Sequence, residues 1–394
     1  MKALLFERSL PRLAAARLAA TLSSSGSAAR VGPLRLTDVD EPELPGPDWH
    51  RIRPRLAGIC GSDLATIDAR SSRWFEPIVS FPFVPGHEVV GELDDGTRVV
   101  LEPVLACAAR RIEPPCPSCA NGDDGGCERI AFGHLAPGLQ TGYCADTGGG
   151  WSLGLVAHQS QIHLVPDDLD DDAAVMVEPT ACAVHAVESA EVSPGATVAV
   201  VGSGTLGLCT VAAVARLTSA GCLIASAKYA DQRRLARDLG ADQVAAPDEL
   251  MRAVRRVTGS MAVGPTEGDT AGRADRLSGG ADVTFDCVGS ADSIEQALAV
   301  TRPRGRIVLI GMPGQVNVDL TPLWQREIAL VGAYAYRHAT FETAFGLVRD
   351  AGLGRLVSAH YPLERFSEAI EHAATAGRRG AVKIVFDLRS ERRR

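Results

Sequence analysis

The chain has 394 residues, of which 46% are hydrophobic and 22% charged, and its formal net charge is −8. This length exceeds what one hydrophobic core usually supports, so two domains are expected. The modest negative charge gives no support for nucleic acid or an acidic membrane as a partner. No apolar run reaches the roughly 20 residues that span a bilayer, and Arg17 interrupts the alanine-rich segment 13–20, which argues against a signal peptide.

The ten cysteines bear on the compartment. Without a sign of export, the chain is expected to be cytoplasmic, where cysteines are reduced thiols and metal ligands rather than disulfides. The short basic C-terminus, residues 389–394, is interpreted as a solvated end.

The first part of the chain predicts short strands separated by turns. Segments 34–39, 50–55 and 97–101 alternate in polarity or are rich in β-branched residues. Proline and glycine punctuate them, as in residues 42–47. This pattern favours a mostly antiparallel, barrel-like domain. Residues 12–32, with a serine-rich stretch at 23–27, are expected to form a surface insertion.

From Asp170 onward the pattern changes to alternating helices and strands. Helices are expected at 171–190, 205–219, 231–239 and 293–300, and strands at 197–201, 222–226, 282–287, 306–310 and 328–334. Such alternation is typical of a parallel sheet covered by helices on both faces. Residues 259–280 are expected to be a loop. The chain then predicts helices at 340–350 and 363–376 and a strand at 382–386.

A glycine-rich turn follows the strand at 197–201, reading Gly-x-Gly-x-x-Gly and opening a helix. This context supports a dinucleotide site over a purely structural turn. The first glycine permits the tight turn, the second the approach of backbone to the pyrophosphate, and the third the packing of helix on strand. The N–H groups at the start of the helix bind phosphate. The expected cofactor-binding residues are Gly202, Ser203, Gly204, Thr205, Leu206 and Gly207.

The end of the next strand favours NADP over NAD. Recognition of NAD uses an acidic residue roughly 20 positions after the turn, whereas this strand ends in Ser226 and is followed by Lys228. A small residue and a cation suit a 2′-phosphate, so both are expected to contact it. The alternative is that Lys228 is a solvated loop residue and the cofactor is NAD or either one.

Two segments in the first half carry residue types that bind zinc. Residues 58–63 read Gly-Ile-Cys-Gly-Ser-Asp, and residues 86–91 read Gly-His-Glu-Val-Val-Gly. Cys60, His87 and Glu88 thus offer a thiolate, an imidazole and a carboxylate, and a catalytic zinc keeps one position open. A metal site upstream of a dinucleotide turn suggests zinc-assisted hydride transfer.

A second group of metal-ligating residues consists of four cysteines, Cys107, Cys116, Cys119 and Cys127. Four thiolates in a short loop suit a closed, tetrahedral structural zinc site. The alternative is a lobe that holds no metal, with Cys107 buried as a small hydrophobic residue.

Together these motifs resemble the zinc-dependent branch of the medium-chain dehydrogenase/reductase superfamily, which includes alcohol, polyol and threonine dehydrogenases. The resemblance extends from Leu34 to Phe386 and implies an α/β fold class. A GroES-like β-barrel catalytic domain is expected over residues 1–175 and 335–394. A Rossmann domain with a doubly wound parallel sheet is expected over 176–334. The resemblance also implies an active site where the two domains meet.

The resemblance assigns the catalytic zinc ligands. Cys60 and His87 match two of them, and Glu88 matches a glutamate that either ligates the metal or lies just behind it. Glu178 matches the third ligand position, which is a glutamate in the polyol and threonine branch. Glu178 holds either the zinc or the water bound to it. Cys182, four residues later on the same helix face, is a competing ligand candidate, but a place in the core is the preferred interpretation for it.

Other family positions are matched in part. Ser62 matches the hydroxyl that relays the proton, and Asp63 matches a carboxylate that orients the ligand histidine. The histidine that passes the proton onward in many relatives is Ala65 here, which leaves the proton route open. The last three cysteines of the second group have the family's spacing, but eight residues instead of two separate Cys107 from Cys116.

The expected function is a zinc-dependent oxidoreductase that transfers a hydride between an alcohol or polyol, or the matching carbonyl, and NADP or NAD. Glu178 favours a polyol, sugar or amino alcohol as the substrate. The alternatives are a zinc-free quinone or enone reductase of the same superfamily and a non-catalytic NADP-binding protein. The expected partners are the small-molecule substrate and further copies of the chain, as a homodimer or homotetramer, without nucleic acid or membrane.

Overall fold

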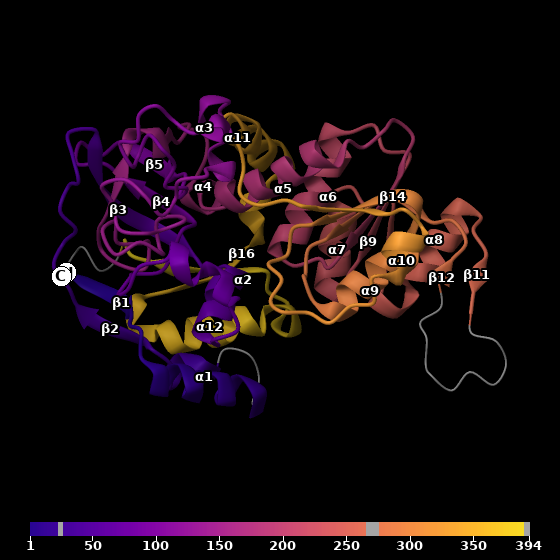
Figure 1. Cartoon of the computed structure of the whole chain (residues 1–394), viewed down its shortest axis with the longest axis horizontal. Coiled ribbons are helices and arrows are strands. Elements are labelled where there is room, and N and C mark those ends of the chain that lie inside the picture. Colours follow the sequence, from indigo (N-terminus) through magenta and orange to yellow (C-terminus); the bar gives the residue numbers. More distant parts are fainter. Residues whose placement is uncertain (23–26, 265–275, 390–394) are drawn as a thin grey trace. The chain divides into compact units, whose positions relative to one another are not determined.

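The structure, a computed structural model, describes residues 1–22, 27–264 and 276–389 (Figure 1). The chain divides into two compact units, Met1–Ala181 together with Ala335–Arg394, and Cys182–Tyr334. Within the described ranges no helix combines the length and the apolar character that crossing a membrane requires.

The first unit is built on a seven-stranded sheet in the order β16-β17-β3-β4-β5-β7, with β6 paired to β3. All of its pairs are antiparallel except β16 with β17, and β1 and β2 form a separate antiparallel pair. Its strands are β1 (Lys2–Phe6), β2 (Leu34–Asp38), β3 (Trp49–Gly58), β4 (Val89–Glu92), β5 (Arg98–Leu101), β6 (Leu155–His158), β7 (Ile162–Leu164), β16 (Val357–Tyr361) and β17 (Lys383–Asp387).

Helices lie between these strands in the chain, and two of them follow the second unit. They are α1 (Leu10–Leu22), α2 (Gly61–Ile67), α3 (Pro117–Ala120), α4 (Asp171–Ala174), α11 (Thr340–Ala351) and α12 (Phe366–Ala374). The 14-residue helix α5 (Val177–Ala190) crosses from the first unit into the second. The core of the first unit contains Ile52, Phe83, Trp151 and Phe386, all at most 2% exposed.

The second unit contains a six-stranded parallel sheet in the order β10-β9-β8-β13-β14-β15. Starting from β8, the first three strands follow one another towards one side of the sheet and the last three towards the other side. This strand order is that of a doubly wound dinucleotide fold. The strands are β8 (Thr197–Val201), β9 (Cys222–Ser226), β10 (Gln243–Ala245), β13 (Ala281–Asp286), β14 (Thr301–Leu309) and β15 (Ala329–Gly332). The helices are α6 (Thr205–Leu217), α7 (Ala230–Asp238), α8 (Leu250–Thr258), α9 (Ala291–Val300) and α10 (Thr321–Gln325).

Several predicted elements need correction. The helix predicted at 171–190 is two helices, α4 and α5, separated by Val175 and Met176. The segment 12–32 is more than a surface insertion, because α1 buries Ala16 completely and Ala28 joins the same core. The loop predicted at 259–280 contains a short antiparallel pair, β11 (Ala262–Val263) with β12 (Arg276–Leu277), and helix α8 before it was missed. Residues 23–26, 265–275 and 390–394 lie outside the described residues.

Candidate active site

Cys60 is held at the start of α2, two residues after the central strand β3 ends. Its backbone N–H donates to Asp63 Oδ2 at 2.9 Å, which fixes the first turn of the helix. Asp63 itself is 1% exposed, and its other oxygen accepts a hydrogen bond from the Tyr143 hydroxyl at 3.4 Å. The capping interaction therefore orients a buried carboxylate beside the thiol.

His87 lies next to this carboxylate and is 4% exposed. Its Nδ1 is 3.5 Å from Asp63 Oδ1, but the geometry leaves this buried nitrogen without a hydrogen-bond partner. Burial lowers the pKa of His87, but Asp63 and the thiol of Cys60 raise it by a larger amount. The pKa of His87 therefore lies well above its usual value. Metal-ligating histidines usually donate their other ring N–H to a carboxylate, a carbonyl or water, and here Asp63 lies beside Nδ1 without forming that hydrogen bond.

Glu88 forms a buried ion pair with Lys383 of β17. Both side chains are 2% exposed, and Lys383 Nζ also donates to the carbonyl of Ile59 at 3.3 Å. Burial opposes the charge of Lys383, but Glu88 and other nearby acidic groups raise its pKa. Gly58 makes room for the pair, since a Cβ atom there would lie 2.0 Å from Glu88 Oε2.

Glu178, in the first turn of α5, is 6% exposed. The hydroxyl of buried Tyr336 donates to its Oε1 at 3.1 Å. Burial, with the negative charge of Glu88, raises the pKa of Glu178 to about 7, although His87 and Lys383 act in the opposite direction. The charges of His87 and Glu88 thus act on Glu178.

The described residues contain two groups of at least three potential metal ligands whose ligand atoms all lie within 4.8 Å of one another. One is the group of four cysteines, and the other consists of Glu102, His163 and His338. The predicted trio of Cys60, His87 and Glu178 is more widely spaced than this, so its assignment as a zinc site stays a prediction.

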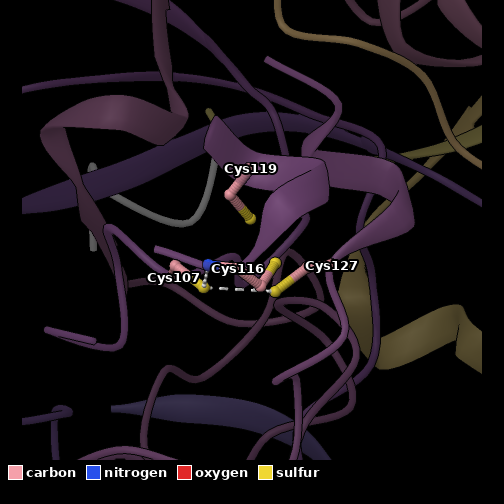
Figure 2. Close-up of side chains that lie close together, drawn as sticks. All are labelled: Cys107, Cys116, Cys119 and Cys127. Atoms are coloured by element: carbon pink, nitrogen blue, oxygen red, sulfur yellow. Dashed lines mark hydrogen bonds between the residues drawn. The ribbon is translucent and has the colours of Figure 1, made fainter. Parts of the chain in front are cut away.

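The four cysteines are gathered around α3, as Figure 2 shows. Cys107 Sγ lies 3.7 Å from Cys127 Sγ, which matches the roughly 3.8 Å between sulfurs that share one tetrahedral zinc at about 2.3 Å. Burial raises the pKa of Cys119, and burial with the neighbouring Cys107 raises the pKa of Cys127 to about 11. A bound dication stabilises the thiolate form and so lowers these pKa values. The donor set therefore fits zinc despite the long gap after Cys107.

The dinucleotide turn has the expected form in the second unit. Gly202 adopts a φ of 88°, and Gly204 is the N-cap of α6. A Cβ atom at Gly207 would lie 1.8 Å from the Gly202 carbonyl oxygen, whereas a Cβ at Gly204 would meet nothing within 4 Å. The third glycine is thus required for packing, and space is open above the second, where a pyrophosphate is expected.

Ser226 and Lys228 differ in exposure at the end of β9. Ser226 is 2% exposed, and its carbonyl accepts a hydrogen bond from the Ser203 hydroxyl at 2.9 Å. Lys228 is exposed, with Nζ 5.9 Å from the centre of the Tyr229 ring. Arg233 donates to the carbonyls of Ala227 and Lys228, which fixes this loop.

The sequence analysis missed Lys383 and Tyr336, which contact Glu88 and Glu178 of the predicted catalytic site. A lysine at the start of the apolar run 383–386 was the available signal for a buried charge. Tyr336 gave no signal, because its role depends on the packing of a segment 158 residues after Glu178.

Two family models match this chain. The alcohol dehydrogenase GroES-like domain matches residues 46–167, and the zinc-binding dehydrogenase model matches residues 205–350. The first range contains Cys60, His87 and the four clustered cysteines, and the second begins at Thr205, inside the dinucleotide turn.

Curated relatives match most of the chain. L-idonate 5-dehydrogenase of Vitis vinifera is 28% identical, and sorbitol dehydrogenase of Arabidopsis thaliana is 29% identical, each over 87% of this chain and 89% of the relative. An NADP-bound structure from Sinorhizobium meliloti 1021, assigned as a zinc-binding dehydrogenase, has a TM-score of 0.69 and 24% identity. It covers 91% of this chain and 97% of that chain. The structural match supports the same fold.

Proposed function

The chain belongs to the zinc-dependent medium-chain dehydrogenase/reductase superfamily, and from the chemistry of its buried cluster we propose that it oxidises a polyol with NADP. The observation that carries this proposal is the buried imidazole of His87, 3.5 Å from Asp63 and without a hydrogen bond at Nδ1. The relatives named for sorbitol and L-idonate support a polyol as the substrate class.

Cys60, His87 and Glu178 are the residues proposed to hold the catalytic zinc. Glu88 is neutralised by Lys383, which favours a position behind the metal for Glu88. When bound, zinc supplies a Lewis acid that lowers the pKa of the substrate hydroxyl. Asp63, whose Oδ1 lies 3.5 Å from His87 Nδ1, is proposed to orient the imidazole towards the metal.

A chain of hydroxyl groups is proposed to carry the alcohol proton outward in place of the histidine missing at position 65. The Ser62 hydroxyl is close enough to that of Tyr143 to lower its pKa, although burial raises that pKa overall. The Tyr143 hydroxyl lies 3.3 Å from Thr66 Oγ1, which in turn lies 2.9 Å from Ser71 Oγ. A hydroxyl group can both donate and accept a hydrogen bond, as a proton relay requires, although in this structure Thr66 Oγ1 donates to the Ser62 carbonyl.

The nicotinamide cofactor accepts the hydride, and the second unit is proposed to bind it. Residues from Gly202 to Gly207 cradle the pyrophosphate, and Ser226 and Lys228 contact the 2′-phosphate. The absence of a carboxylate at the end of β9 supports NADP, because a carboxylate there would repel a phosphate.

We further propose that the enzyme works in the cytoplasm as a homodimer or homotetramer. All ten cysteines are free thiols, as expected in a reducing compartment. In the second unit, β15 forms one edge of the sheet, and Leu330 on it is 42% exposed. Such an edge is suited to pairing with a second copy.

The test combines metal analysis with turnover. The purified chain is assayed with a panel of polyols and either cofactor, beside Cys60→Ala and the control Cys182→Ala on α5. Cys60→Ala is expected to lower kcat/KM at least about a thousandfold, since the Lewis acid contributes about 4 kcal/mol or more. Cys182→Ala should stay near wild type. Unchanged turnover by Cys60→Ala, or turnover of quinones without zinc, contradicts the proposal.

A further inference from the structure

Three side chains from distant segments of the first unit meet outside both predicted zinc sites. Glu102 follows β5, His163 lies in β7, and His338 precedes α11. His163 Nε2 and His338 Nδ1 each lie 2.7 Å from the same oxygen, Oε2 of Glu102. The carboxylate side chain is 2% exposed, whereas that of His338 is 50% exposed.

The packing around the three residues fixes their arrangement. The ring of His163 stacks on buried Phe341, with centroids 4.2 Å apart and an interplanar angle of 4°. The centroid of His338 lies 4.6 Å from that of His163. The Glu102 carbonyl accepts a hydrogen bond from Gln161 Nε2 at 3.1 Å. The side chains therefore need little ordering to act together.

Two imidazoles and one carboxylate form a donor set that binds zinc and leaves a coordination position open. Ligand atoms that bind one zinc ion at about 2.0–2.2 Å lie roughly 2.9–3.5 Å apart. Each imidazole nitrogen, 2.7 Å from Glu102 Oε2, needs to move away from that oxygen by only a few tenths of an ångström, and all three ligand atoms lie within 4.8 Å of one another. The exposed imidazole of His338 can make that movement.

The group is also reachable from solvent. His163 and His338 line a pocket of about 570 Å³ together with Pro166, Glu342 and Arg349. Water from this pocket can complete the coordination sphere, and an ion can enter through it.

We propose that Glu102, His163 and His338 form a third metal site, which binds Zn²⁺. The ion replaces the two hydrogen bonds to Glu102 with three metal–ligand bonds. It thereby ties β5 and β7 to the segment before α11, 236 residues further along the chain than Glu102. Because the three ligands come together only in the folded unit, zinc binding stabilises that unit. This inference does not depend on the catalytic assignment.

The test measures zinc stoichiometry and melting temperature for the full chain and for His338→Gln. The control is His360→Gln, because His360 also contacts a carboxylate, Asp172 Oδ1 at 2.7 Å, but has no second imidazole there. His338→Gln is expected to bind one zinc fewer per chain and to lose part of the rise in melting temperature on adding Zn²⁺. His360→Gln should behave as wild type.

Anomalous diffraction at the zinc edge from wild-type crystals provides a readout that needs no variant. A peak between Glu102 and the two imidazoles is expected. No peak there after soaking in Zn²⁺, or an unchanged stoichiometry in both His338→Gln and His163→Gln, shows that the three residues are only a hydrogen-bonded cluster. Either result overturns the proposal and leaves the catalytic assignment untouched.

Discussion

Glu178 is a buried carboxyl whose pKa is raised to about 7, chiefly by its burial. The folded chain therefore holds this proton more tightly than the unfolded chain, in which a glutamate titrates near its usual value of about 4.3. The folded state binds more protons than the unfolded state between these two pH values, so this group makes stability fall as pH rises. The loss begins near the unfolded pKa and is complete above about pH 7.

Glu178→Gln should abolish this dependence in the metal-free protein. The glutamine carbonyl still accepts a hydrogen bond from Tyr336, but the side chain no longer titrates. Between about pH 4.5 and pH 8, the wild type is expected to lose about 3 kcal/mol relative to the variant. Urea unfolding at four pH values across this range measures the difference.

The control for this experiment is Glu188→Gln, an exposed glutamate on the same helix. Its curve should run parallel to that of the wild type. Parallel curves for Glu178→Gln as well would mean that the carboxyl is not buried in its neutral form. Glu178→Gln should also lower the affinity for the catalytic zinc if Glu178 is a ligand.

At the scale of elements, the carboxyl ends of two neighbouring strands, β8 and β9, are proposed to have different roles in cofactor binding. The turn between β8 and α6 is proposed to bind the pyrophosphate that both cofactors share, because Gly204 leaves open space. Discrimination between the cofactors is proposed to depend on the end of β9, where the Ser226 carbonyl accepts a hydrogen bond from Ser203. One side chain can therefore change the preference without disturbing the turn.

Ser226→Asp is expected to shift the preference from NADP towards NAD. The new carboxylate repels the 2′-phosphate and can accept hydrogen bonds from the ribose hydroxyls. A cost of about 3 kcal/mol lowers the ratio of kcat/KM for NADP over NAD on the order of 100-fold. Steady-state kinetics with both cofactors measures this ratio.

Arg234→Ala is the matched control for the change at Ser226. Arg234 lies on α7, but its charge is already paired with Asp231 at 3.6 Å and Asp238 at 3.4 Å. Its removal should leave the cofactor ratio unchanged. If Ser226→Asp leaves the ratio of kcat/KM for NADP over NAD unchanged, the end of β9 does not recognise the 2′-phosphate.

At the scale of the whole molecule, local sequence patterns predicted the parts of the fold that local physics determines. The strands β8 and β9 begin and end where alternation and flanking turns indicated. The superfamily and its fold class are confirmed by the family models and the structural match. The ligand set and the cofactor contacts stay predictions, since no ion or cofactor tests them.

What the sequence could not reveal depends on contacts between distant segments. Lys383 neutralises Glu88 from 295 residues away, and Tyr336 reaches Glu178 across 158 residues. Neither partner follows from periodicity, because packing of the C-terminal segment into the first unit creates both contacts. The His163–Glu102–His338 group was missed for the same reason.

The group of four cysteines connects such distant contacts to stability. Gly125, within this lobe, donates its N–H to the Tyr336 carbonyl at 3.2 Å, and the Tyr336 hydroxyl binds Glu178. The zinc ion predicted for this lobe would therefore also help to position Glu178. Loss of the ion should affect both melting temperature and turnover.

Cys119→Ser is expected to remove one zinc per chain, lower the melting temperature by roughly 5–10 °C and reduce kcat severalfold. Calorimetry, elemental analysis and kinetics measure the three effects, with Cys222→Ser, a half-buried cysteine of β9 outside the lobe, as the control. Unchanged melting and zinc content would mean that the lobe folds without metal. A lower melting temperature with unchanged kcat would instead mean that the lobe does not help to position Glu178 through Tyr336, because loss of the zinc would then affect only the lobe itself.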